Sequence, residues 1–187
     1  MNKERVGRII GGSFGVVFVQ ISAGKLPTAV GGPLRLLAIA AFVGMLVVKR
    51  RGATARPAED AAPAPAPAAP APRVGFGRRY WYVVAAEAVA LLGGLVLINP
   101  VLHAPQVTVG WIAFVVGVHF FGLATAWQLP SLRTLGAAMA ACGLGGMVLA
   151  CFGAPAAVIA VVAGIAPGAL LLAWTWRPGA AAPAAVR

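Results

Sequence analysis

Two ionisable side chains lie deep inside long apolar stretches of the sequence, where they could carry chemistry. Glu87 falls within a stretch at about 80–100, and His119 falls within another at about 107–127. An ionisable group inside a membrane span is costly to bury, so each is a functional hypothesis by default. A carboxylate beside an imidazole can exchange a proton, and proton relays in transporters use such glutamate and histidine side chains.

The depths of the two side chains match. Glu87 lies seven residues from the expected start of its helix and His119 lies eight from the expected end of its own. At 1.5 Å per residue, both are roughly 10 to 12 Å deep. A short turn around 101–106 joins the two helices, so we expect an antiparallel hairpin with the pair opposite each other about a centre at His103. Contact then requires that both faces turn inward.

Two other interpretations of the pair stay open. In the first, a hydrogen bond between Glu87 and His119 simply holds the hairpin together, without proton exchange. In the second, Glu87 turns toward the lipid headgroups, among Arg78, Arg79 and Tyr80, and no pair forms.

A faint internal repeat adds Gln20 as a third candidate site residue. The segment Phe14–Gln20 aligns with Trp81–Glu87, which places Gln20 at the position equivalent to Glu87. If the repeat is real, it implies helical hairpins in parallel orientation, related by an axis along the membrane normal.

Other chemistries lack the residues that they need. His103 and His119 are sixteen residues apart, roughly 24 Å in a helix, which is too far to share a metal ion. The sequence contains no phosphate-binding loop, nucleophile elbow or H-E-x-x-H element. We therefore expect no catalytic residue, no metal and no cofactor, and interpret His103 as a solvated turn residue.

The composition is that of an integral membrane protein. Of the 187 residues, 60% are apolar and 10% charged, and the mean hydropathy is +0.89; soluble domains have roughly 25% charged residues. Stretches of about 17 to 25 apolar residues can span a bilayer as helices. Six are expected, at approximately 6–24, 33–48, 80–100, 107–127, 132–151 and 155–176.

The basic residues predict the orientation of these helices. Thirteen Lys and Arg residues lie at the termini and in alternate connections, whereas the other connections hold only Lys25 and Arg35. Because basic residues stay on the cytoplasmic side, we expect an all-α polytopic bundle with both termini inside. The net charge of +11 thus indicates anionic lipid headgroups rather than nucleic acid. An excess of Arg over Lys, with much Ala, Gly and Pro, is typical of a GC-rich bacterium, which favours the inner (plasma) membrane.

The chain is expected to divide at an Ala/Pro-rich cytoplasmic linker, residues 52–77. A first hairpin, 1–51, precedes it, and a four-helix unit, 78–177, and a cytoplasmic tail, 178–187, follow. The first apolar stretch could instead be a cleaved signal peptide. Two stripes of small residues allow close helix packing, within one subunit or in a homo-oligomer: Gly7, Gly11 and Gly15, and Ala156, Ala160, Gly164 and Gly168.

The stretch Gly117–Ala124, with a Gly-Val-His-Phe element, is followed by Pro130 and Gly136. It resembles a pattern in small uncharacterised multi-pass membrane proteins of bacteria, in which the next helix follows a proline-marked turn. The resemblance covers residues 80–150 and implies a helical membrane fold, with no function to carry over.

Two functions are therefore expected. The first is a non-enzymatic transport or proton-responsive module centred on Glu87 and His119, with Gln20 nearby. The second is a structural or partner-binding membrane subunit, in which these side chains only pack.

Overall fold

A computed structural model describes residues 3–54, 78–127 and 129–177, and over these ranges it forms helices and no strands. The bounds of the α-helices are α1 Lys3–Ser22, α2 Thr28–Thr54, α3 Arg78–Val96, α4 Thr108–Trp127, α5 Ser131–Cys151, α6 Ala156–Ala160 and α7 Ala166–Trp176. A π-helical turn, Leu97–Val101, extends α3, and another, Val161–Ile165, joins α6 to α7. Short 3-10 turns lie at Ala23–Lys25 and Pro105–Val107.

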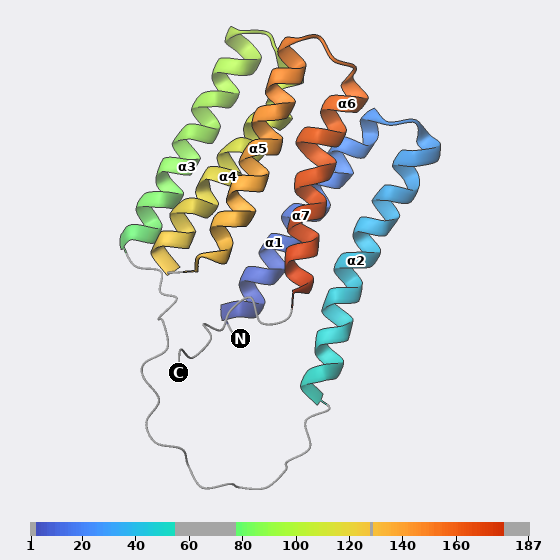
Figure 1. Ribbon diagram of the computed structural model, residues 1–187, viewed down its shortest axis with the longest axis vertical. Coiled ribbons are helices and arrows are strands. Elements are labelled where there is room, and N and C mark those ends of the chain that lie inside the picture. Colours follow the sequence, from blue (N-terminus) through green and yellow to red (C-terminus); the bar gives the residue numbers. More distant parts are fainter. Residues whose placement is uncertain (1–2, 55–77, 128, 178–187) are drawn as a thin grey trace, which may run out of the picture.

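Six of these helical runs are long and apolar enough to cross a membrane, so the protein is a multi-pass membrane protein with an all-α fold. The spans are Gly7–Lys25, Thr28–Val48, Tyr80–Val101, Pro105–Thr125, Ser131–Cys151 and Ala156–Trp176. Helices α1 and α3 begin, and α2 and α7 end, at the same end of the bundle (Figure 1). This arrangement agrees with the alternation that the basic residues predict.

The predicted start of the second helix, at residue 33, is wrong. Helix α2 begins at Thr28, because the carbonyl of Pro27 accepts hydrogen bonds from the N–H groups of Val30 and Gly31, each at 2.9 Å. Gly31 also packs directly on the carbonyl oxygen of Ala23, where a side chain would collide. At its other end the helix runs to Thr54, three residues into the predicted linker. The rest of that linker, 55–77, and the tail, 178–187, lie outside the described residues.

The helices pack in the spatial order α3, α4, α5, α7, α1 and α2, so that α3 and α2 lie at opposite edges (Figure 1). Phe18 of α1 and Leu171 of α7 belong to the same buried cluster as Ala113 of α4 and Met139 of α5. The first hairpin therefore shares its core with the helices that follow residue 78. Outward-facing side chains are apolar as well, which suits contact with lipid tails.

The small-residue stripes pack largely inside the subunit. A Cβ added to Gly15 would lie 2.9 Å from the carbonyl oxygen of Gly168, and one added to Gly168 would lie 2.8 Å from that of Gly15. Gly164 contacts the Ser22 side chain at the other end of the same interface. Gly7 has open space around it, and an oligomer through it stays a prediction.

Candidate functional site

Helices α3 and α4 bring Glu87 and His119 into contact. Nδ1 of His119 lies 2.8 Å from Oε2 of Glu87, and the side chains retain 15% and 23% of their exposure, respectively. The sequence places both residues at equal distance from the turn near residue 103, and a short antiparallel hairpin preserves that register. The alternative in which Glu87 turns to the headgroups, with no pair formed, is therefore wrong.

The contact has the separation of an ion pair without the alignment of a hydrogen bond. Nδ1 of His119 is buried and has no hydrogen-bond partner of acceptable geometry among the described residues, although Oε2 of Glu87 lies within reach. Hydrogen bonds weaken steeply when the donor direction departs from the acceptor. A small rotation of either side chain would therefore change the strength of this contact considerably.

A steric contact continues the α3–α4 interface toward the start of α3. Gly122 of α4 faces Val83 of α3, whose Cγ2 lies 3.1 Å from the position that a Cβ on Gly122 would occupy. Val83 lies four residues before Glu87 and Gly122 three after His119. The Glu87–His119 pair is thus followed by a close apolar contact on the side of the chain termini.

Toward the opposite end, two further contacts join the same helices. The indole of Trp111 lies against Gly94, where a Cβ would approach its Cζ2 to 2.6 Å. Beyond it, the hydroxyl of Thr108 donates to Oδ1 of Asn99 at 3.1 Å, and Nδ2 of Asn99 donates to the carbonyl of Leu95 at 3.1 Å. The α3–α4 interface therefore has polar contacts at two levels and glycine contacts at two others.

This interface is the main attachment of α3 to the bundle. Among the described helices, α4 is the one with which α3 shares an extensive interface. Only 6% of the membrane span of α3 is buried, against 33% for the span of α4. A change at the Glu87–His119 contact therefore acts on a helix that few other contacts hold in place.

The structure does not bring Gln20 to the pair. Its Nε2 donates to the carbonyl of Arg35 at 3.2 Å, across the α1–α2 hairpin. Gln20 thus contacts the second helix of its own hairpin, α2, whereas Glu87 contacts α4. The repeat that aligned the two residues stays a prediction.

His103 is an exposed turn residue, as the sequence predicts. It has a φ of +50°, the left-handed conformation that ends a helix, and the N–H of Ala104 bonds to the carbonyl of Ile98 at 3.0 Å. Within the described residues, no three of His, Cys, Asp and Glu come together as metal ligands.

Sequence reasoning missed the Asn99–Thr108 contact, which a simple signal could have revealed. Asn99 and Thr108 are placed almost symmetrically about residue 103, as are Glu87 and His119. Besides Nδ1 of His119, two further buried polar atoms have no hydrogen-bond partner among the described residues: Oγ of Ser22 and Nε1 of Trp111. No such signal in the sequence marks them. Their burial depends on neighbouring helices rather than on spacing.

No protein-family model, no curated protein and no solved structure matches the chain. The resemblance built on Gly117–Ala124 therefore stays a prediction, and the function has to be argued from the geometry of this site.

Proposed function

We propose that this protein is a proton-responsive membrane module, in which the protonation of the Glu87–His119 pair controls how firmly α3 packs on α4. The observation that carries the proposal is the 2.8 Å contact between Nδ1 of His119 and Oε2 of Glu87 at the main attachment of α3. An imidazole is the side chain whose charge changes most readily near neutral pH.

The number of protons on the pair determines the net charge at the interface. With one exchangeable proton, the pair is either a carboxylate with an imidazolium or two neutral groups, and it carries no net charge. Removal of that proton gives the pair a net negative charge. Addition of a second proton gives the pair a net positive charge. A net charge in an apolar interface is costly, so the α3–α4 interface should be firmest in the intermediate state.

The surroundings of the pair favour a response to protons over their conduction. The next polar side chain along α3 toward the opposite end is Asn99, twelve residues beyond Glu87, or about 18 Å along a helix. Between these levels the interface is occupied by the Trp111 indole against Gly94. A proton on the pair therefore has no adjacent titratable side chain on α3 to which it can pass in that direction.

A second candidate function is a structural membrane subunit, with the pair as a fixed polar contact. It is favoured by the close backbone packing of α4 on α5, where a Cβ on Gly117 would lie 2.8 Å from Cα of Ala140. Such packing suits a rigid scaffold. Under either function we propose a non-enzymatic protein of the inner (plasma) membrane of a bacterium, oriented with both termini in the cytoplasm.

The test is a pH-dependent distance measurement on the reconstituted protein. Spin labels at Val89→Cys on α3 and Leu144→Cys on α5, both outward-facing, are introduced after replacement of Cys142 and Cys151. We expect the distance distribution to change with pH. The change should be lost in Glu87→Gln and in His119→Ala.

The outcomes separate the candidates. A distance that is constant with pH, together with lowered thermal stability in both variants, would support the structural subunit. A pH-driven proton flux across the vesicle membrane that both variants lose would instead support transport. A pH response of the same size in wild type and both variants would remove the pair from the mechanism.

A further inference from the structure

An arginine and a tryptophan are held together where α7 ends. Cζ of Arg177 lies 4.8 Å from the centroid of the Trp174 ring, a cation–π contact. The backbone N–H of Arg177 also bonds to the carbonyl of Trp174 at 3.2 Å. The backbone bond ends the helix at this point, and the cation–π contact orients the exposed guanidinium of Arg177 beside the Trp174 ring.

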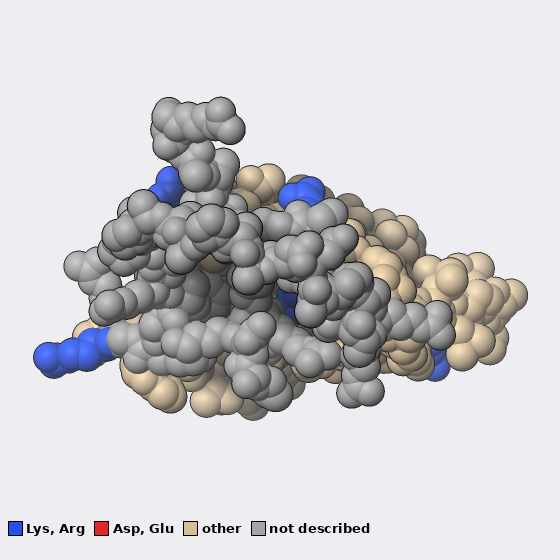
Figure 2. Space-filling model, turned by 90° about the horizontal axis from the view of Figure 1, so that it is seen from below, with Lys and Arg blue, Asp and Glu red and all other residues tan. Residues whose placement is uncertain are grey.

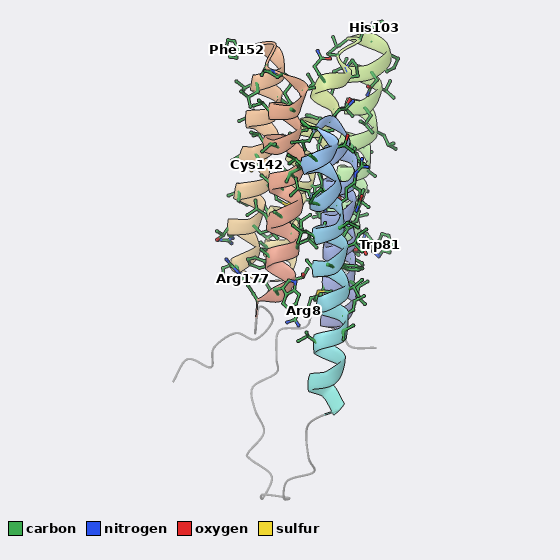
Figure 3. The ribbon with its side chains drawn as sticks, turned by 90° about the vertical axis from the view of Figure 1, so that its right-hand side faces the viewer. Arg8, Trp81, His103, Cys142, Phe152 and Arg177 are labelled. Carbon is green, nitrogen blue, oxygen red and sulfur yellow. The ribbon has the colours of Figure 1, made fainter. Side chains whose placement is uncertain are left out.

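A second arginine, on α1, lies at the same end of the bundle. Cβ atoms added to Gly11 and Gly12 would lie 3.9 and 3.7 Å from Cγ2 of Thr175, so these turns of α1 and α7 are at one level. Arg8 lies one helical turn before Gly11 and on the same face. Figure 3 shows Arg8 and Arg177 at the same end of the bundle.

The charged residues whose side chains the structure describes at this end are basic: Arg8, Arg78, Arg133 and Arg177. Viewed from below, Figure 2 shows blue Lys and Arg side chains and no red Asp or Glu among the described residues in view. Glu4 precedes Arg8 by four residues in α1 and is the acidic residue for which an experiment must control. The span of α1 begins at this end of the bundle and the span of α7 ends there, at the expected depth of lipid headgroups.

We propose that Arg8 and Arg177, beside Trp174, bind the phosphate of an anionic phospholipid. Guanidinium groups bind phosphate oxygens through paired hydrogen bonds, and tryptophan is favoured at the level of the headgroups. A phospholipid also supplies acyl chains for the apolar outer surface of α7, where Trp176 is exposed. Free phosphate would gain nothing from that surface. This inference is independent of the Glu87–His119 pair.

The experiment is a lipid titration of the delipidated full-length protein, followed by native mass spectrometry. Wild type should bind phosphatidylglycerol more tightly than phosphatidylcholine. Basic residues near a membrane contribute about 1 kcal/mol each, so Arg8→Gln and Arg177→Gln should each weaken phosphatidylglycerol binding about fivefold, and the double variant about 25-fold. Arg8→Lys with Arg177→Lys should lose less, because the charge remains while the paired hydrogen bonds are lost.

The matched control is Lys25→Gln with Arg35→Gln, which removes the same charge from the opposite end; its binding should change less than about twofold. Glu4→Gln should retain or strengthen binding. Thermal melts verify that each variant is folded. If Arg8→Gln with Arg177→Gln is unfolded, Arg8→Lys with Arg177→Lys takes its place in the comparison. Three outcomes would each overturn the proposal. Phosphatidylglycerol binding could fall equally in the Arg8/Arg177 double variant and in the control, or stay unchanged in the double variant. Inorganic phosphate could also displace the lipid.

Discussion

Helix α4 has two interfaces of opposite character. On α5, its glycines bring backbone against backbone: a Cβ on Gly143 would lie 2.6 Å from the carbonyl oxygen of Gly110 and 2.8 Å from Cα of Phe114. On α3, by contrast, polar side chains meet at two levels, including the Glu87–His119 contact. Close backbone packing characterises the first interface, and the second adds polar contacts.

The difference shows how a small membrane protein can combine rigidity with response. Lipid tails are as apolar as leucine, so helices in a membrane associate through close packing and polar contacts rather than through the hydrophobic effect. Close packing on α5 does not change with pH. Under the proposed function the Glu87–His119 contact on α3 does, and among the described helices it lies on the one with the least buried span.

The largest expected effect comes from a methyl group in the α4–α5 interface. Gly117→Ala would place Cβ 2.8 Å from Cα of Ala140 and 2.9 Å from the carbonyl oxygen of Gly136. Because these are backbone atoms, we expect a loss of about 3 kcal/mol in the free energy of unfolding. Unfolding in mixed micelles with increasing denaturing detergent measures it.

The control for that variant is Gly93→Ala, on the open face of α3, where nothing lies within 4 Å. It should be neutral, or stabilising by up to about 1 kcal/mol through helix propensity. An equal loss in Gly117→Ala and Gly93→Ala would contradict the contrast between packed and open glycines.

A smaller effect is expected from the same change in the α3–α4 interface. Gly94→Ala would bring Cβ against the indole of Trp111, 2.6 Å from Cζ2. Since α3 lies at the edge of the bundle and can shift outward, we expect a loss of about 1.5 kcal/mol. The same unfolding assay measures it, and a loss as large as that of Gly117→Ala would show that α3 is held as rigidly as α5.

A double-mutant cycle isolates the coupling between Glu87 and His119. Glu87→Gln, His119→Gln and the double variant should give a coupling free energy of about 1 kcal/mol at neutral pH. Coupling should fall when the pair gains or loses a proton, because a net charge then remains at the interface. Strictly additive losses at every pH would mean that the 2.8 Å contact contributes nothing to stability.

The smallest effect is expected at the outer polar contact. Asn99→Ala and Thr108→Val should each cost about 0.6 kcal/mol, as is common for hydrogen bonds between membrane helices. An amide and a hydroxyl do not titrate near neutral pH, so this loss should be constant with pH. A pH dependence like that of the Glu87–His119 pair would indicate that the response is not specific to the pair.

The Glu87–His119 contact shows how far spacing along a chain can predict a site. Within a helical hairpin closed by a short turn, residues equidistant from the turn lie at the same depth, and whether they meet depends on which face of each helix turns inward. Gln20 marks the limit of that reasoning. Its assignment depended on a repeat between helices that share no turn, and the bond from Gln20 to the Arg35 carbonyl was not visible in the pattern.

The sequence by itself determined the number of spans and the equal depth of Glu87 and His119 in the α3–α4 hairpin, because length, hydropathy and turn length are local properties. The spacing of the basic residues likewise predicts which end is cytoplasmic. Only the tertiary structure decided that α1 packs on α7, that α3 lies at the edge on α4, and that α2 begins at Thr28. Those choices depend on which small residues of different helices meet, and in a span that is apolar on all sides, hydropathy does not mark the face that packs.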